Sequence, residues 1–551
     1  VKMWIIGDEF SARYLQDAVE LVYVNPDNYQ EVLLNGELDC LLFVSPWRGL
    51  GKYVEASARE ASHFFGEGGL DMAEHIMKYA RSNGVRTIFQ TIEDPPNYSR
   101  FLRIARCADV IFTTAKEMVP RYIKDTGNEN VYVEEYGINP MVHNPIGFLR
   151  KRQLPGYNLV GCAMFAGSWY KKYKKRCKAS KMLFDGVLES NPKGLYIFNR
   201  KWGEEDGWFP PEYKSSIMPA MDYLDLQKAH KMLDWTVNLN TVTDSATMCA
   251  MRVYEVQALG GLLLSNYALS VSASFPGVFT VLDSGEVPRI LSGYTPREIA
   301  GFQLEGVRDM YSGRTVYDRL NRVLSLAGLP QRFEGRPVYV VCEGERAREA
   351  LRSQSLAGAV AVDPADAASL RDGLAVWWDG GTGNPDHLLD MVNAFKFADV
   401  DYVRYEPWGE PGRCYEFVEG DAEPSGTMFD LARVPASRVL AGDLDGLRGF
   451  GIVEPEWGRD TSATPKDLAV IVPVYNNGDY LWRRSFRSLM RSSVFDRMRV
   501  YLVDDGSTDG ETPQVVARIA RDFDNVEAYF FADGGSGSAS RPRNKGFELS
   551  S

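Results

Sequence analysis

The chain has 551 residues and a mass of 61.8 kDa, which is too long for one hydrophobic core and predicts roughly three or four domains. Its composition, 45% hydrophobic and 25% charged, is that of a soluble globular protein, and 12% aromatic residues argue against disorder. A net charge of -12 and a pI of about 5.2 disfavour a nucleic-acid partner, because proteins that bind phosphate backbones present a basic surface. Any anion site must therefore be local.

Cysteine usage and hydropathy indicate the compartment. The seven cysteines form no CxxC pair and are odd in number, so neither a disulfide framework nor a zinc site is expected. No pair of histidines has metal-ligand spacing, and we expect no metal held by the first half of the chain. The sequence shows no signal peptide and no apolar run of about 20 residues. We expect a cytoplasmic protein that is at most peripheral to the inner face of the cell membrane.

The first 332 residues alternate short apolar runs with segments of helical period, the βαβ rhythm of a parallel sheet with helices on both faces. The rhythm restarts after a loop, so we predict one domain over residues 1–155 and a second over 156–332. The predicted strands are 3–6, 41–44, 87–90, 110–113, 131–133, 159–165, 194–199, 237–239 and 262–265, with helices at 171–189 and 250–259.

The composition then shifts to Ala, Asp, Arg and Gly. Strands at 338–341 and 375–378 and a helix at 385–398 predict a third unit over 333–455. A linker precedes a fourth βαβ pattern over 466–551, with strands at 468–472 and 500–503 and a helix at 481–492. Because the pattern is unfinished at Ser551, we expect the sequence to be a fragment of a longer protein.

The predicted helix at 250–259 carries Arg252 and Glu255, which lie on one face because they are three residues apart. A carboxylate such as Glu255 can accept two hydrogen bonds from the paired hydroxyls of a ribose or a sugar. The alternative is an Arg–Glu pair on a helix surface with no functional role.

Features suited to phosphate precede that helix. Gly167 and Ser168 follow the first strand of the second domain, where glycine lets backbone N–H groups approach a diphosphate. A basic run at 171–178, which includes Lys172, comes next, and Arg200 ends the following strand. Together they predict an anion cleft, although a solvated helix face would also explain the basic run.

A series of motifs runs through these two domains: VSPWRGLG at 44–51, EDPPNY at 93–98, IFTT at 111–114, YGINP at 136–140, HNP at 143–145, FAGS at 165–168, VNLN at 237–240 and RVYE at 252–255. The series resembles the group 1 glycosyltransferases related to the spore-maturation protein CgeB. The resemblance implies a GT-B fold, in which two Rossmann-like domains face each other across a cleft. It also implies transfer of a sugar from a nucleotide donor.

The resemblance implies that the second domain binds most of the donor without a cofactor, through Gly167, Ser168, Lys172, Arg200, Asn240, Arg252 and Glu255. Glu255, Glu93 and Asp94 are the predicted catalytic residues, and Asp8 and Glu9 are further candidates for an acceptor base. Each of these first-domain acids also has a structural explanation, since Asp-Pro-Pro favours a loop. Many retaining GT-B enzymes carry another Glu eight residues before the position of Glu255. Thr247 stands there, which leaves retention or inversion open.

The fourth unit carries a second series: VPVYN at 472–476, VDDGSTD at 503–509 and RPRNKG at 541–546. This order resembles the family 2 glycosyltransferases of GT-A fold. It implies a nucleoside site formed by Pro473, Tyr475, Asp504, Asp505 and Arg543. In that family the metal-binding Asp-x-Asp and the catalytic carboxylate come later, so Mg or Mn is expected only for a completed module. We expect no catalysis from residues 466–551.

The third unit contains WDGGTGNPD at 378–386, which resembles the segment after the metal site of GT-A enzymes and predicts a non-catalytic GT-A-like spacer. The expected fold is α/β, with two Rossmann-like domains in GT-B arrangement, a GT-A-like region and a truncated GT-A half. The predicted function is a glycosyltransferase that extends a cell-surface polysaccharide or teichoic-acid-like polymer, with a glycan or lipid-linked acceptor. The alternative is an inactive GT-B-like scaffold. An NAD-dependent enzyme is set aside, because no GxGxxG motif follows the first predicted strand.

Overall fold

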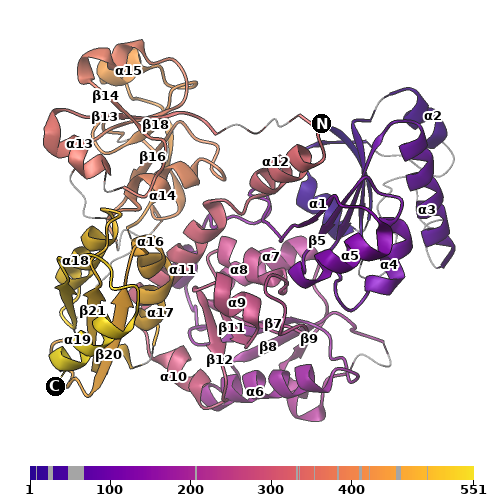
Figure 1. Cartoon of the computed structure of the whole chain (residues 1–551), viewed down its shortest axis with the longest axis horizontal. Helices are drawn as coiled ribbons and strands as arrows, with labels where there is room; N and C mark the ends of the chain where they lie inside the picture. The colour runs from indigo at the N-terminus through magenta and orange to yellow at the C-terminus, as the bar shows by residue number, and fades with distance from the viewer. Residues whose placement is uncertain are drawn as a thin grey trace.

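The computed structural model describes residues 1–550 except 8, 23–28, 37, 47–66, 205–207, 331–332, 334, 353, 381–383, 409–411, 421, 455–460 and 493, with the backbone alone at 9, 10, 12, 67, 68 and 346. Four α/β modules follow one another along the chain (Figure 1). The first lies at the upper right and the second below it. The third and fourth lie one above the other at the left.

The first module is a parallel sheet in the order β2-β1-β3-β4-β5-β6. Strands β3 and β5 are buried along their whole length, as expected for parallel strands that are covered on both faces. The strands are β1 (Lys2–Ile6), β2 (Glu20–Leu21), β3 (Cys40–Val44), β4 (Arg86–Thr91), β5 (Val110–Thr113) and β6 (Val131–Val133). The helices are α1 (Glu9–Leu15), α2 (Tyr29–Leu34), α3 (Glu67–Ser82), α4 (Tyr98–Ala105), η2 (Lys116–Met118) and α5 (Val119–Thr126). The predicted strands of this module are confirmed.

The second module repeats this architecture in the order β12-β11-β10-β7-β8-β9. Its strands are β7 (Ala163–Gly167), β8 (Leu195–Asn199), β9 (Ile217–Met218), β10 (Trp235–Asn238), β11 (Leu262–Asn266) and β12 (Val278–Val281). Its helices are η3 (Arg150–Gln153), α6 (Lys174–Ser190), η4 (Pro211–Ser216), α7 (Tyr223–Met232), α8 (Arg252–Ala258), α9 (Leu269–Ser274) and α10 (Glu286–Ser292). The strand predicted at 159–165 begins later, because Cys162 N–H closes a turn onto the Leu159 carbonyl.

Two helices, α11 (Pro296–Tyr311) and α12 (Val316–Leu326), lead back from the second module to the first. Each begins with a reciprocal capping box, between Thr295 and Glu298 and between Thr315 and Asp318. Although α12 follows the second sheet in the sequence, its apolar face joins a buried cluster with the first sheet. The structure therefore adds this helix to the first domain, outside the boundary that the sequence predicted.

The third module is a mixed sheet in the order β14-β13-β15-β18-β16-β19-β17. Its strands are β13 (Val338–Val341), β14 (Val360–Val362), β15 (Leu374–Trp377), β16 (Tyr402–Tyr405), β17 (Glu416–Glu419), β18 (Met428–Asp430) and β19 (Arg448–Ile452), and its helices are α13 (Gly344–Arg352), η5 (Pro364–Ser369), α14 (His387–Ala394) and α15 (Ala436–Leu440). The Tyr311 and Phe397 rings meet across the boundary at 4.8 Å. The predicted spacer thus shares one hydrophobic core with the second module.

The fourth module has three parallel strands, β20 (Leu468–Val474), β21 (Met498–Asp504) and β22 (Val526–Phe530). Its helices are α16 (Gly478–Tyr480), the π-helical η6 (Leu481–Phe486), α17 (Arg487–Met490), η7 (Phe495–Arg497), α18 (Thr512–Asp522) and α19 (Ser540–Ser550). The helix predicted at 481–492 is therefore divided in two. The module has a hydrophobic core of its own.

Candidate functional site

A cavity of about 450 Å³ lies between the first and second modules. Its walls are the start of α4 in the first module and, in the second, the carboxyl ends of β7, β8 and β10 with the start of α8. Ligands of parallel α/β sheets bind beyond these strand ends, and the volume suits a small molecule. Seven of the residues predicted from the sequence line it: Glu93, Gly167, Ser168, Lys172, Arg200, Asn240 and Arg252.

Two arginines of the second module hold the turn at the end of β7. Arg252 donates a hydrogen bond to the Ala166 carbonyl, and Arg176 donates one to the Ser168 carbonyl at 3.0 Å. Both carbonyls belong to the turn that was predicted to bind phosphate. Arg176 was not singled out from the sequence, because only the fold shows which cation of the basic run reaches this turn.

The same arginines lie close to other positive charges. Burial and the nearby charges of Arg200 and Arg176 together lower the pKa of Arg252 to about 10, although the charge of Glu255 acts in the opposite direction. Burial, with the charge of Arg200, also lowers the pKa of Arg176. No carboxylate in the described part of the chain forms an ion pair with either guanidinium. Cations that oppose one another inside a cavity indicate a site for an anion.

The turn itself offers a further donor. The Ser168 hydroxyl is buried, and it has no hydrogen-bond partner among the described residues. Gly167 is required for steric reasons, since a Cβ there would lie 2.6 Å from the Phe165 ring. A buried hydroxyl without a partner is uncommon, which makes a bound ligand the natural acceptor for Ser168.

Asn240 stabilises the site through two hydrogen bonds. Its Nδ2 donates to Ser265 Oγ at 3.2 Å, and its Oδ1 accepts from the Ala250 N–H at 3.0 Å. The side chain thereby fixes the loop that leads into α8. Lys172 stands at the cavity wall with its ammonium 4.8 Å from the centre of the Tyr173 ring.

Glu255 does not line the cavity. Its Oε1 accepts from the Tyr223 hydroxyl at 2.7 Å, and that hydroxyl lies 2.7 Å from His143 Nε2. His143 Nδ1 accepts the Asn139 N–H at 3.1 Å, which places the imidazole proton on Nε2. The pKa of Glu255 falls below its usual value, because hydrogen bonds from His143 and Tyr223 outweigh the opposing effect of burial. Its predicted contact with the donor stays a prediction.

Of the two predicted acids of the first module, only Glu93 reaches the cavity. It is 8% exposed and accepts a hydrogen bond from Asn97 at 3.0 Å. Asp94 is fully buried behind the wall, where burial raises its pKa, and it accepts a hydrogen bond from Thr113 at 2.7 Å. The structure therefore gives Asp94 no contact in the cavity. Asp8 and the side chain of Glu9 lie outside the described residues.

Thr247, at the position where a Glu was considered, joins the two modules. Its hydroxyl donates to the Thr114 carbonyl at 2.7 Å and accepts the Lys116 N–H at 3.0 Å. Nearby, Ser245 donates to Glu117 at 3.1 Å. This loop of the second module is thus hydrogen-bonded to the end of β5, and Thr247 acts in the contact between modules.

The fourth module forms a separate acidic site at the ends of β20 and β21. Asp505 accepts from the Ser536 hydroxyl at 2.7 Å and from Arg541 Nε at 2.7 Å, and the Ser507 N–H donates to Asp504. The exposed Tyr475 ring lies against Gly535, where a Cβ would come within 2.4 Å of it. Pro473 pairs with β21 beside them. Arg541 reaches Asp505, whereas the prediction named Arg543, which lies exposed on α19.

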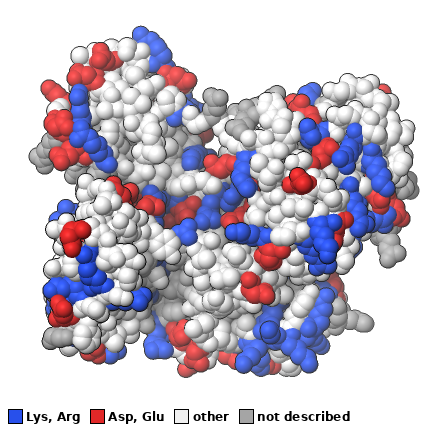
Figure 2. Space-filling model, in the orientation of Figure 1, with Lys and Arg blue, Asp and Glu red and all other residues white. Residues whose placement is uncertain are grey.

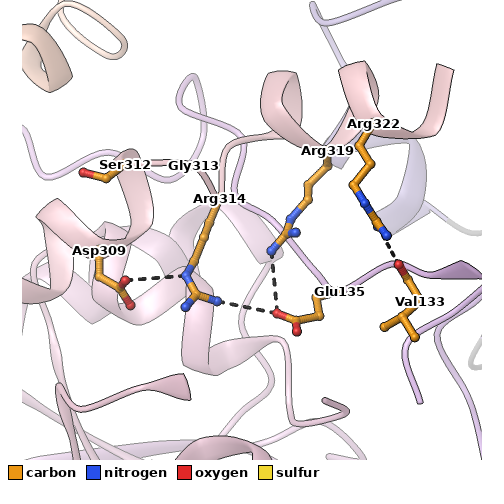
Figure 3. Close-up of a pocket in the computed structure, with 8 residues that line it drawn as sticks. All are labelled: Val133, Glu135, Asp309, Ser312, Gly313, Arg314, Arg319 and Arg322. Carbon is orange, nitrogen blue, oxygen red and sulfur yellow. Dashed lines mark hydrogen bonds and ion pairs between the residues drawn. The ribbon is translucent and has the colours of Figure 1, made fainter. Parts of the chain in front are cut away.

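A second cavity, of about 430 Å³, lies where α11 meets α12 (Figure 3). Arg314 pairs with Asp309 at 3.6 Å and with Glu135 at 3.5 Å, and Arg319 also reaches Glu135, at 3.7 Å. Arg322 bonds to the Val133 carbonyl and to Glu134. Here each guanidinium has a carboxylate partner, which distinguishes this cavity from the one between the modules. Figure 2 shows further Lys and Arg side chains gathered over the face that carries α6.

Comparison with known proteins bears on the fourth module. Residues 469–551 match the model of the family described as glycosyl transferase family 2. The C-terminal module is similar to family 2 glycosyltransferases. This match confirms the resemblance that the motifs of the module carried. Among curated proteins, no relative matches the sequence of the chain.

Solved structures similar to the chain are remote in sequence. Alr3699/HepE of Anabaena, solved with UDP and glucose, is 11% identical over 59% of this chain and 92% of its own, with a TM-score of 0.39. The N-terminal domain of trehalose-6-phosphate phosphatase of Candida albicans is 10% identical over 59% and 96%, with a TM-score of 0.34. The wall teichoic acid polymerase TagF is 11% identical over 59% and 88%, with a TM-score of 0.30.

Proposed function

We propose that the chain is a glycosyltransferase that uses a nucleotide-sugar donor, and that the cavity between its first two modules is the donor site. The observation that carries this proposal is that Arg252 and Arg176 hold the Gly167–Ser168 turn and form no ion pair with a carboxylate of the described residues. A bound diphosphate would supply the negative charge that balances the guanidinium groups at this turn. The family 2 match of the last module supports the same class of chemistry.

In this proposal the donor diphosphate binds the Ser168 hydroxyl and the guanidinium of Arg252, with Arg200 at its side. The acceptor enters from the wall that carries Glu93. Its hydroxyl oxygen forms a bond to the anomeric carbon, while the bond from that carbon to the diphosphate breaks. The proton of the hydroxyl goes to a base, for which Glu93 is the acid within reach of the cavity. The cations stabilise the charge that develops on the leaving diphosphate.

The proposed acceptor is a growing cell-surface polysaccharide or teichoic-acid-like polymer, glycan or lipid-linked, and the proposed location is the cytoplasm or the inner face of the membrane. Within the part of the chain that the structure describes, there is no helix both long and apolar enough to cross a bilayer. The nucleoside site at Asp504 and Asp505 is proposed to need Mg or Mn only when a GT-A module is complete.

The alternative is an inactive GT-B-like scaffold in polymer assembly. Two observations favour it: Thr247 bonds to the first module where a carboxylate was considered, and Glu255 is directed at Tyr223. Donor binding distinguishes the two functions. A scaffold would not require a diphosphate on the Gly167–Ser168 turn.

The test measures UDP affinity by calorimetry, and transfer or hydrolysis with a panel of nucleotide sugars. It is done in an Asp505→Asn background, so that the last module contributes little. Arg252→Ala should weaken UDP binding about 10- to 100-fold, the value of a charge-assisted hydrogen bond. Arg103→Ala is the matched control, since Arg103 pairs with Asp71 and Glu74 on the surface. If neither the parent nor the variant binds any nucleotide, the enzyme function is wrong and the scaffold is favoured.

A further inference from the structure

Arg100 and Lys172 line the cavity from different modules. Arg100 lies in α4 of the first module, and Lys172 lies just before α6 of the second. Both side chains are exposed, and neither forms an ion pair or a side-chain hydrogen bond with the residues that the structure describes. The Arg100 guanidinium rests 5.6 Å from the centre of the Phe101 ring. Two cations of this cavity are therefore free to meet a ligand.

These two cations are distinct from the cluster at the Gly167–Ser168 turn. Arg252 and Arg176 donate hydrogen bonds to carbonyls at that turn, whereas no described residue accepts a hydrogen bond from the side chain of Arg100 or Lys172. Arg100 and Lys172 are exposed, whereas the turn that Arg252 and Arg176 contact is buried, so the two exposed cations stand at the solvent side of the cavity.

The lining of the cavity is predominantly basic. Six basic side chains line the cavity, namely Arg100, Lys172, Arg176, Arg200, Lys201 and Arg252, against one acidic side chain, Glu93. Lys201 is paired with Glu204 at 3.2 Å. Arg252 and Arg176 already donate hydrogen bonds to carbonyls at the inner turn, whereas Arg100 and Lys172 remain available for a second anion.

We infer that Arg100, with Lys172, binds a phosphate group carried by the acceptor. This inference rests on the proposed function, in which the donor diphosphate occupies the inner turn. Arg100 belongs to the first module, across the cavity from that turn, so the group that it meets belongs to the acceptor. A guanidinium binds phosphate through two parallel hydrogen bonds, and an ammonium adds a point charge. The substrate class is an acceptor that bears phosphate.

The experiment titrates glycerol 3-phosphate into the full chain saturated with UDP, at constant ionic strength, with glycerol as the uncharged control. The parent should bind glycerol 3-phosphate but not glycerol. Arg100→Ala should weaken this binding about tenfold and leave UDP affinity unchanged, since one charge-assisted contact is lost. Arg103→Ala, one turn along the same helix, should bind like the parent. Equal unfolding midpoints of the two variants show that both are folded.

The inference fails if the UDP-saturated parent does not bind glycerol 3-phosphate, or if Arg100→Ala binds it as tightly as the parent. A second comparison shows whether Arg100 contacts the acceptor or the sugar of the donor. If Arg100→Ala weakens UDP-glucuronic acid but not UDP-glucose, Arg100 recognises the donor sugar and the acceptor assignment is wrong. If UDP does not bind at all, the donor proposal fails, and the same titration without UDP decides the Arg100 site on its own.

Discussion

Arg491, directly after α17, and Glu305 of α11 form a buried ion pair that joins the fourth module to the second. Arg487 reaches Glu305 at 3.3 Å and also Asp386 of the third module at 3.2 Å. Arg308 of α11 pairs with the same Asp386 at 2.9 Å. Three modules therefore share one buried ionic network, and α11 contributes both Glu305 and Arg308 to it.

Glu305→Leu should destabilise the protein strongly. The change leaves Arg491 and Arg487 near each other without their shared carboxylate, and loss of one partner from a buried pair costs about 3–5 kcal/mol. Urea unfolding measures the effect as a lower midpoint. Glu527→Leu is the control, because Glu527 pairs with Arg499 at the surface, where such pairs contribute about 0–1 kcal/mol. A Glu305→Leu variant as stable as this control would contradict the network.

Glu255→Gln should destabilise the chain at neutral pH and less so in acid. The folded state lowers the pKa of Glu255 below 4.5, so the unfolded state binds its proton first as pH falls. The ionised carboxylate therefore stabilises the fold above about pH 4.5, and the effect disappears once pH falls below its folded pKa. We expect a difference of about 1–3 kcal/mol near neutral pH. The thermal unfolding midpoints of parent and variant should approach each other as the pH is lowered from neutral into the acid range. A constant difference would show that Glu255 is not ionised in the fold.

Asp505→Asn should affect the fourth module alone. Arg541 would lose its carboxylate partner at 2.7 Å, and the ends of β20 and β21 would bind a nucleoside less well. Because the cavity between the first two modules is separate, the UDP affinity of that cavity should not change. If UDP binds both the cavity and the fourth module, calorimetry of the Asp505→Asn variant should show the loss of the site in the fourth module alone. Loss of all binding with Asp505→Asn would mean that the cavity is not a nucleotide site.

Arg314→Ala should loosen the corner between α11 and α12 (Figure 3). Arg314 connects Asp309 of the second module with Glu135 of the first, and its guanidinium lies 4.6 Å from the centre of the Phe275 ring. Several partly buried contacts are lost together, so we expect a cost of about 1–3 kcal/mol. Hydrogen exchange should increase at the start of α12 while α6 is unchanged. Uniform exchange across both helices would argue against a local role for Arg314.

The strands and the phosphate-binding turn could be predicted from the sequence because both depend on local patterns. Buried parallel strands appear as short apolar runs, and these runs located β3, β5 and β11 to within a residue or two. Gly167 and Ser168 were found because they follow such a strand directly. Arg200 was found at a strand end and Arg252 by its helical spacing, and the family resemblance added Asn240; the fold brings all three to one cavity.

Only the tertiary structure decided which other side chains belong to the site. Arg100 and Arg176 come from different modules, and no local pattern separates them from other surface arginines. The direction of Glu255 depends on Tyr223, a partner 32 residues away. Long-range contacts also decided that α12 packs on the first sheet and that Arg541 bonds to Asp505. Hydrophobic periodicity specifies which face of an element is buried, but the partner of that face depends on how the whole chain packs.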